Sequence, residues 1–284
     1  MWNINYDKLS DISLVLEANG LAMSKKLGQN FLIDKNARER IAEIINAKEN
    51  STTWEIGPGL GAITSLVLAE GAYVKAFELD KGFCTILGET AFSDEEKFTL
   101  VAGDALKTLF REKEKPEIIY GNLPYNVGSV CIAKLIENSL LPERMVFTLQ
   151  KEVVERMVAD FNSENYSSFS ILCQIDYNVS YAFTINQSCF YPIPKVDSAV
   201  VLMQKRENSL VSEDIRPLFL SLVRELFKSR RKNIRNNMST SKFNLTKQAI
   251  DEILEKANLS PTLRAEAIEI NDLINLAKIV KEYV

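Results

Sequence analysis

The sequence of 284 residues contains no histidine. Imidazole therefore cannot act as a general base, complete a Ser-His-Asp triad or bind zinc in this chain. Any chemistry must depend on carboxylates, amides, backbone groups and aromatic rings. Cysteine is also scarce: there are four, and none has C-x-x-C spacing. We interpret them as reduced core residues of a cytosolic protein, and we predict no metal site.

Long apolar runs are missing as well. No stretch approaches the ~20 apolar residues that a membrane-spanning helix needs, and the first residues lack the basic start and apolar core of a secretory signal. The composition, 46% hydrophobic and 25% charged with a net charge of −4, is that of an ordinary globular protein. It argues against a uniformly basic nucleic-acid binder, but it leaves room for a local basic patch. We therefore expect a cytoplasmic protein with no membrane partner.

Strand and helix patterns alternate along residues 52–160. The predicted strands are 52–56, 73–78, 98–102, 117–121 and 144–149, and the predicted helices are 62–70, 81–90, 129–138 and 151–160. This alternation predicts an α/β fold with a parallel sheet and right-handed crossovers. The pattern is β-like again at 169–179, 181–185 and 198–204. Two of these strands, joined as a hairpin, would finish the sheet in antiparallel fashion.

Residues 207–284 change character and have only helical patterns, at about 213–228, 230–237, 246–256 and 271–283. We place a domain boundary near Glu207, with an α/β domain at 1–206 and a small all-helical domain at 207–284. Residues 1–33 contain a predicted helix at 11–19 and a polar arm. That arm, 24–32, is either a linker between helices or a segment that folds over a cofactor, with Asn30 offering amide hydrogen bonds.

A glycine-rich turn, Glu55–Gly61, joins a predicted strand to a predicted helix. Glycines let the backbone approach a ligand, and the free N–H groups at the start of the helix face it. Gly57, Gly59 and Ala62 also fit the dinucleotide pattern G-x-G-x-x-G/A, so the turn alone does not name its cofactor. Glu78 ends the next strand about 20 positions after the first glycine, where a carboxylate accepts hydrogen bonds from ribose hydroxyls.

Two further strand ends carry polar or glycine residues: Gly103-Asp104 and Gly121-Asn122. Because the carboxyl ends of parallel strands share one edge of a sheet, ligands gather there. Asp104 is either the N-cap of the following helix or an acceptor for the adenine amino group of an adenosyl cofactor. We favour the cofactor role, because Glu78 and the glycine turn point to the same ligand.

Asn122-Leu123-Pro124-Tyr125 follows the fourth strand of the α/β pattern. Asparagine and proline form turns, but this combination also suits chemistry on an adenine amine. The lone pair of that amine is delocalised into the ring. A side-chain amide oxygen and a backbone carbonyl can accept its two N–H bonds and draw the nitrogen towards a tetrahedral state. Proline holds that carbonyl outward, and the aromatic ring stacks on the base, which is worth ~1–3 kcal/mol.

A basic run lies within Lys228–Arg235. Five of its eight residues are cationic: Lys228, Arg230, Arg231, Lys232 and Arg235. A charge run is usually a solvated helix face. Here no acidic residue interrupts it, so its self-repulsion calls for a partner, and a phosphate backbone would supply one.

Several segments together resemble the bacterial small-subunit (16S) rRNA adenine N6,N6-dimethyltransferases, the KsgA/RsmA family. They are Gly28–Leu32, Glu55–Gly61, Glu78–Asp80, Gly103–Ala105, Gly121–Asn126, Leu149–Val154, Pro194–Val200, Arg230–Asn236 and Arg264–Glu266. The resemblance implies a Rossmann-like class I methyltransferase sheet with a helical C-terminal domain. It also implies S-adenosylmethionine as the methyl donor. The implied substrate is a pair of adjacent adenosines in the 3′-terminal hairpin loop of 16S rRNA, within the immature small ribosomal subunit.

The resemblance also assigns roles by position, in a protein that we expect to be a monomer. The implied cofactor residues are Gln29, Asn30, Leu32, Glu55, Gly57, Gly59, Gly61, Glu78, Leu79, Asp104, Ala105 and Asn122. The implied catalytic residues are Asn122, Leu123, Pro124, Tyr125 and Phe190, with Tyr125 and Phe190 sandwiching the flipped-out adenine. The implied RNA-binding residues are Lys195, Lys228, Arg230, Arg231, Lys232 and Arg235. Tyr191 and Ile193 depart from the Thr and Pro that the family often has.

Two other functions remain open. The first is methylation of another target, either by a large-subunit (23S) rRNA enzyme of the erythromycin-resistance type or by a DNA adenine enzyme. These enzymes share the glycine turn and the Asn-x-Pro-Tyr logic, but the basic run and the length of the tail fit the small-subunit family better. The second is a non-catalytic ribosome-assembly factor, against which the intact Asn122, Pro124 and Tyr125 argue.

Overall fold

The computed structural model describes residues 4–21 and 30–284. By its contacts the chain divides into two compact units, Met1–Val154 with Val179–Lys205, and Glu155–Asn178 with Arg206–Val284. This division differs from a single boundary near Glu207, because the chain enters the second unit twice. The early segment contributes Tyr166 and Ile171 to the helical core of that unit, so it belongs there and not with the sheet.

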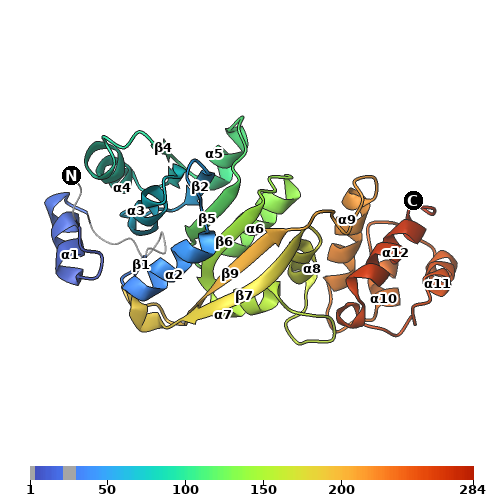
Figure 1. Cartoon of the computed structure of the whole chain (residues 1–284). Helices are drawn as coiled ribbons and strands as arrows, with labels where there is room; N and C mark the ends of the chain where they lie inside the picture. Colours follow the sequence, from blue (N-terminus) through green and yellow to red (C-terminus); the bar gives the residue numbers. More distant parts are fainter. Residues whose placement is uncertain (1–3, 22–29) are drawn as a thin grey trace. The chain divides into compact units, whose positions relative to one another are not determined.

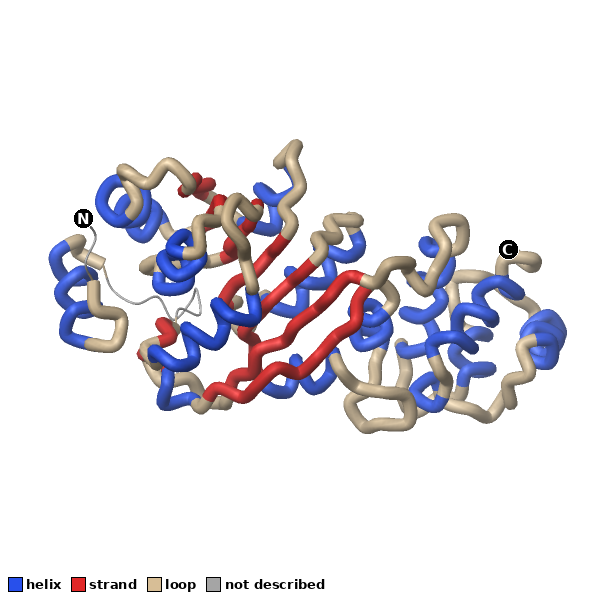
Figure 2. Tube along the Cα trace, viewed as in Figure 1, coloured by secondary structure: helices blue, strands red, loops and turns tan. Residues whose placement is uncertain are grey.

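The first unit is built on a seven-stranded sheet with the order β4-β3-β2-β5-β6-β9-β7 (Figures 1 and 2). The strands are β2 (Thr52–Ile56), β3 (Tyr73–Glu78), β4 (Phe98–Ala102), β5 (Ile118–Asn122), β6 (Arg144–Gln150), β7 (Tyr177–Ile185) and β9 (Ser198–Lys205). From β4 to β6 the neighbouring strands are parallel, and β9 pairs antiparallel to β6. The predicted parallel sheet with an antiparallel finish is confirmed. A separate pair, β1 (Phe31–Leu32) and β8 (Phe190–Tyr191), is antiparallel.

Helices cover the sheet of this unit, with α2 in front of the strands and α6 behind them in Figure 1. The helices are α1 (Leu9–Ala18), α2 (Lys35–Ile45), α3 (Ala62–Ala69), α4 (Lys81–Ile86), α5 (Ala105–Thr108) and α6 (Gly128–Glu137), with α7 (Lys151–Met157) at the unit's end. A π-helical turn, Leu87–Ala91, extends α4, and 3₁₀ turns lie at Leu109–Arg111 and Gln187–Cys189. Side chains of α2 and α3 share one buried apolar cluster with side chains of the sheet, among them Ile41, Val67 and Val146.

Positive φ angles at three glycines shape the turn between β2 and α3. Gly57, Gly59 and Gly61 have φ values of 71°, 59° and 85°, a region that side chains with a Cβ atom rarely adopt. At the last of them a Cβ would also lie 2.6 Å from Cε2 of Phe92. The turn therefore requires glycine for backbone conformation throughout, and for packing at Gly61.

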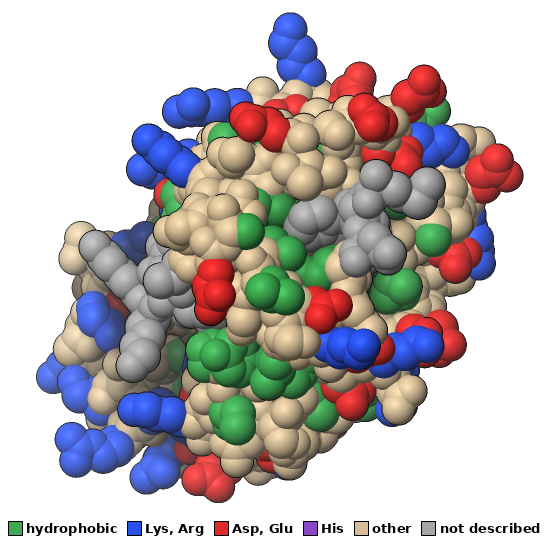
Figure 3. All heavy atoms as spheres, turned by 90° about the vertical axis from the view of Figure 1, so that its left-hand side faces the viewer, with side chains coloured by type: hydrophobic (Ala, Val, Ile, Leu, Met, Phe, Trp, Pro, Cys, Tyr) green, Lys and Arg blue, Asp and Glu red, His purple; other side chains and the backbone are tan. Residues whose placement is uncertain are grey.

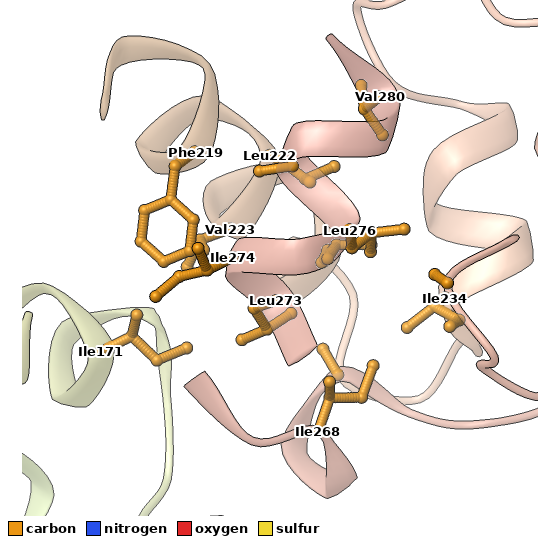
Figure 4. Close-up of a cluster of buried hydrophobic side chains, with 14 of the residues drawn as sticks. Ile171, Phe219, Leu222, Val223, Ile234, Ile268, Leu273, Ile274, Leu276 and Val280 are labelled. Carbon is orange, nitrogen blue, oxygen red and sulfur yellow. The ribbon is translucent and has the colours of Figure 1, made fainter. Parts of the chain in front are cut away.

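The second unit is helical and has its own core, drawn in part in Figure 4. Its helices are α8 (Ser168–Gln174), α9 (Arg216–Phe227), α10 (Ile234–Ser239), α11 (Lys247–Lys256) and α12 (Ile270–Val280), with a 3₁₀ turn at Ala265–Ala267. Phe219, Leu222 and Leu276 are fully buried in that core. A buried ion pair accompanies it, because the guanidinium of Arg216 donates to both oxygens of Asp176 at 2.9 and 2.5 Å.

The β-like interpretation of residues 169–179 is wrong for most of that stretch. Residues Ser168–Gln174 form α8, and the strand begins only at Tyr177. Ser167 starts the helix with a capping box, in which the Ser170 N–H donates to its hydroxyl and its own N–H donates to the Ser170 hydroxyl. Ile171 and Ile175, one turn apart, then lie in the helical core. A short apolar run fits either period, and here the cap and the core select the helix.

Candidate functional site

A pocket of about 210 Å³ lies in the first unit, along the carboxyl ends of the parallel strands. Its wall includes Gly57 after β2, Glu78 at the end of β3, Asp104 after β4 and Asn122 at the end of β5. The chain runs outward from β2 to β4 and then returns to place β5 on the other side of β2. The pocket therefore lies at the point where the strand order reverses, which is where open α/β sheets bind ligands.

Glu78 lines this pocket and is hydrogen-bonded to the glycine turn. The Gly59 N–H donates to its Oε2 at 3.2 Å and the Asp80 N–H donates to its Oε1 at 2.8 Å. Burial raises the pKa of this carboxyl above its ordinary value, and the backbone N–H donors work against that rise,. Since each carboxylate oxygen can accept more than one hydrogen bond, Glu78 can hold the turn and still accept from ribose hydroxyls.

Asp104 combines the two roles that its sequence position allows. Its Oδ1 accepts from the Leu106 N–H at 3.0 Å, which makes it the N-cap of α5, and the residue also lines the pocket. The capping interpretation is confirmed. The bond to the adenine amino group stays a prediction, and the second oxygen, which lies 3.8 Å from Lys107 Nζ, is the atom available for it.

The charge-bearing side chains known to line the pocket are all carboxylic acids. Among its described lining residues the charged ones are Glu55, Glu78 and Asp104, without a lysine or arginine. A dinucleotide would bring an anionic pyrophosphate into this environment without a side-chain cation to meet it. A ligand with a positive centre and free hydroxyls suits the same environment, because opposite charges attract strongly where water is excluded. The glycine turn alone does not identify the cofactor, whereas these acidic side chains favour a cationic adenosyl compound.

Glu55 lies beneath the glycine turn and is 2% exposed. Its Oε2 accepts from the Thr64 hydroxyl at 2.5 Å and from the Tyr120 hydroxyl at 3.1 Å. Burial raises the pKa of this carboxyl to about 7, while the two hydroxyl donors oppose the rise. Thr64 belongs to α3 and Tyr120 to β5, so Glu55 ties β2 to both elements below the pocket.

Asn122 ends β5 with its amide held in place. Its Nδ2 donates to the backbone oxygen of Asn30 at 3.0 Å, so the amide oxygen is the group left to accept a hydrogen bond. The Pro124 carbonyl accepts from the N–H groups of Val127 and Gly128 at the start of α6. The start of α6 is thus bonded to the Pro124 carbonyl, and not to the Leu123 carbonyl that comes directly after Asn122.

Tyr125 lines the same pocket and is fixed by its hydroxyl. Its phenol oxygen lies 2.6 Å from the hydroxyl oxygen of Ser198, the fully buried first residue of β9. Partial burial raises the pKa of this phenol, although the bond to Ser198 opposes the rise. Sequence reasoning noticed Ser198 only as part of the Pro194–Val200 segment and gave it no role. No local pattern predicts that its hydroxyl reaches Tyr125.

Phe190 is buried and does not line the pocket with Tyr125, so its part in a sandwich around the adenine stays a prediction. Its side chain is 1% exposed and belongs to the apolar cluster of α2, α3 and the sheet, and it is not among the residues that line the pocket. The cause is the small β1–β8 pair, in which Phe190 lies opposite Leu32. The exposed large apolar residues of this loop are Tyr191, Ile193 and Val196.

The remaining predicted cofactor residues divide into three groups. Asn30, Leu32, Leu79 and Ala105 line the pocket with those already described, whereas Gly61 faces Phe92 and is not among the lining residues. Gln29 lies outside the described residues. Sequence reasoning missed several lining residues, namely Tyr6, Ile12, Phe31, Ile63, Phe83 and Cys131.

The basic run belongs to the second unit, and acidic residues outside the run neutralise part of it. Arg235 donates to both oxygens of Asp251 at 2.5 and 2.7 Å, and Arg230 donates to Glu266 at 3.3 Å. Lys228 pairs with Glu225. Arg231 and Lys232 are exposed, and no side-chain ion pair is recorded for them among the described residues. The run is therefore less in need of an external partner than its sequence suggests. Lys195 is exposed in a loop of the first unit.

Within residues 4–21 and 30–284, no helix is long and apolar enough to cross a membrane. In the same part of the chain, no group of three or more acidic or cysteine side chains is arranged to hold a metal ion.

Comparison with known proteins decides the family. A family model described as ribosomal RNA adenine dimethylase matches residues 20–278. The chain belongs to this family. The ribosomal RNA small subunit methyltransferase A of Treponema denticola is 41% identical over 281 residues, covering 97% of this chain and 96% of the relative. The protein of that name in Borreliella burgdorferi is 38% identical and covers 99% and 97%. The resemblance predicted from the sequence motifs is confirmed.

Solved structures support the fold. A dimethyladenosine transferase from Plasmodium falciparum superposes with a TM-score of 0.74 at 24% identity, covering 86% of this chain and 94% of that one. The 23S rRNA methyltransferase ErmE gives a TM-score of 0.66 at 21% identity, covering 88% and 99%. The Rossmann-like class I methyltransferase sheet predicted from the sequence is confirmed. At these identities the likeness concerns the fold and does not choose between rRNA targets.

Proposed function

We propose that this rRNA adenine dimethylase family member transfers methyl groups from S-adenosylmethionine to the N6 amines of adenosine in small-subunit rRNA. The observation that carries the proposal is one pocket with two features. Its charged lining is wholly acidic, and Asn122–Tyr125 form part of its wall. A cationic methyl donor and a neutral amine acceptor can therefore meet in the same cavity.

The donor set fits an adenosyl sulfonium compound. Glu78 would accept from the ribose hydroxyls and Asp104 from the adenine amino group, while the glycine turn allows close approach of the backbone. When bound, this compound supplies an electrophilic methyl group. The acids of the pocket favour its positive charge by Coulomb attraction. Nothing in this donor set requires a metal ion.

The chain's own residues would prepare the acceptor. The Asn122 amide oxygen and the Leu123 carbonyl accept the two N–H bonds of the adenine amine, and this draws its lone pair out of the ring. Tyr125, held by Ser198, stacks on the base and offsets part of the cost of removing it from its neighbours. The amine loses its proton after methyl transfer, when it is strongly acidic. This order suits a chain without histidine, because no base is needed before attack.

We further propose that the substrate is two adjacent adenosines of the 3′-terminal hairpin loop of 16S rRNA, presented by an immature small subunit in the cytoplasm. A monomethylated amine retains one N–H for the same acceptors, so a second transfer is chemically accessible. A hairpin loop releases a base at lower cost than a duplex does. The acidic protein as a whole would repel long bare nucleic acid, which favours a structured RNA. We expect the protein to act as a monomer.

The test is to incubate the protein and donor with immature small subunits, large-subunit rRNA or adenine-rich duplex DNA, and to analyse the nucleosides by mass spectrometry. We expect N6,N6-dimethyladenosine only with the small subunits, and much slower product formation by an Asn122→Ala variant. Dimethylation of large-subunit rRNA would instead support an enzyme of the erythromycin-resistance type. No methylation of any substrate would support a non-catalytic assembly factor.

A further inference from the structure

The first 19 residues lie before the stretch that the family model matches, which begins at residue 20. The structure describes most of them, including α1, and they contact the pocket of the first unit. Tyr6 and Ile12 are both among the residues that line it. A segment that precedes the stretch matched by the family model therefore supplies part of the pocket wall.

Three contacts hold this segment against the glycine turn. The Tyr6 hydroxyl donates to the backbone oxygen of Leu60 at 2.9 Å. Ile12 and Leu16 are 1% and 6% exposed and share a buried cluster with Leu60 and Phe83. A helix that buries its apolar side against the turn is fixed by the hydrophobic effect as well as by hydrogen bonds.

A buried arginine adds an electrostatic contact. Arg38 of α2 is 6% exposed, donates to the Leu32 carbonyl at 3.0 Å and forms an ion pair with Asp7. Its guanidinium carbon lies 5.7 Å from the centre of the Tyr6 ring. Because a buried guanidinium needs its partner, Asp7 holds the backbone beside Tyr6 close to Leu32, another lining residue.

We propose that Tyr6 is a binding residue for the methyl donor, held in the pocket wall by this N-terminal segment. The inference rests on the proposed function, since it assigns the ligand of the same pocket. The hydroxyl is bonded to Leu60, so the ring contributes its face and apolar edge to the ligand. Together with Ile12 it covers apolar surface of the bound adenosyl sulfonium compound and keeps water from it.

The test measures donor binding to the full-length protein by calorimetry with S-adenosylmethionine. Tyr6→Ala should raise its Kd by about tenfold, the scale expected when the contact of one aromatic face is lost. Tyr6→Phe retains the ring and removes the hydroxyl that donates to Leu60, so its Kd should lie between those of the wild type and Tyr6→Ala. Leu14→Ala is the control, because Leu14 lies in the same N-terminal segment, on α1, and its side chain is 63% exposed.

Thermal unfolding and RNA affinity of each variant separate this role from a structural one. Both should stay close to wild type in Tyr6→Phe, and RNA affinity should stay unchanged in Tyr6→Ala. A Tyr6→Ala protein that binds the donor within twofold of wild type would overturn the inference and leave the proposed function intact. A wild-type protein that binds no donor would overturn both.

The Leu14→Ala control is informative because Leu14 lies on the exposed surface of this segment. Figure 3 turns the left-hand side of Figure 1 toward the viewer, and apolar side chains gather near the middle of that face, with charged side chains around them. Leu9 and Leu14 of α1 are exposed apolar residues. Loss of an exposed leucine should not change donor affinity. A fall in affinity with Leu14→Ala equal to that with Tyr6→Ala would show that any change in the N-terminal segment acts indirectly, and it would overturn the role of the ring.

Discussion

The phenol oxygen of Tyr125 lies 2.6 Å from the hydroxyl oxygen of Ser198. One residue belongs to the turn that follows β5 and the other begins β9, which is not its neighbour in the sheet. The bond therefore fixes the aromatic ring of the proposed reaction centre from across β6. A ring that must stack on a flipped-out base gains from this restraint, because less of its freedom is lost on binding.

Ser198→Ala should slow methyl transfer by about 3- to 10-fold, the scale of one lost hydrogen bond, and should leave donor Kd unchanged. A double-mutant cycle with Tyr125→Phe, which keeps the ring and removes the same bond, isolates the mechanism. If Ser198 acts through the phenol, the two substitutions together should slow the reaction hardly more than either one. Fully additive effects on the rate would contradict this role.

Asn122→Ala should lower the methyl-transfer rate by ~100-fold or more while RNA binding stays nearly intact, because the amide acts at the reacting centre. Single-turnover kinetics with saturating donor measures the rate, and filter binding measures RNA affinity. Asn126→Ala is the matched control: Asn126 is an exposed asparagine four positions along the same turn and does not line the pocket. Equal losses of rate in the two variants would refute the assignment.

Much of the pocket could be predicted from the sequence because its residues follow strands. Gly57, Glu78, Asp104 and Asn122 each come at or just after the end of a periodic apolar segment, and parallel strands bring such ends to one edge. Local patterns decide this arrangement. The acidic character of the pocket lining could not be predicted from the sequence, because it depends on which lysines and arginines lie outside the pocket.

The residues that were missed or misplaced depend on tertiary pairing. The aromatic position of Phe190 predicts stacking, yet its pairing with Leu32 turns the ring into the core. Tyr6 carries no motif, and its place in the wall follows from the burial of Ile12 and the ion pair of Asp7. Contacts of this kind join segments far apart in sequence, and no local period encodes them.

The basic run should bind RNA unevenly, because its cations differ in their partners. The backbone at the start of the basic run is held by Asn237, whose amide donates to the carbonyls of Leu226 and Ser229. Arg231→Ala with Lys232→Ala removes two exposed cations and should flatten the log-affinity versus log-salt slope by up to ~1.4–1.8, at ~0.7–0.9 per contact. Arg235→Ala should change the slope little, since Asp251 already neutralises that guanidinium.

Titration of RNA binding at several salt concentrations measures these slopes. Lys242→Ala with Lys247→Ala is the control, because it removes the same charge from exposed positions of the same unit. If the log-affinity versus log-salt slope falls equally in both double variants, RNA affinity depends only on the net charge of the protein. An unchanged slope in the first would make the run a solvated surface.

Glu55 should make the first unit less stable as the pH rises through the range between its unfolded and folded pKa values. Its folded pKa is about 7 and its ordinary value is 4.5. Below 4.5 both states hold the proton. Between the two values the unfolded chain ionises while the folded protein keeps the proton, so the free energy of unfolding falls until about pH 7 and then stays reduced. Between pH 5 and pH 8 the loss should be about 2–3 kcal/mol.

Glu55→Gln keeps an acceptor for Thr64 and Tyr120 but does not titrate, so it should remove that loss. Urea unfolding followed by tryptophan fluorescence, which reports on β2 through the buried Trp54, measures the difference at each pH. Glu43→Gln, at an exposed position of α2, is the control. A wild-type protein and a Glu55→Gln variant whose stabilities change in parallel from pH 5 to pH 8 would show that Glu55 already ionises near its ordinary pKa when folded.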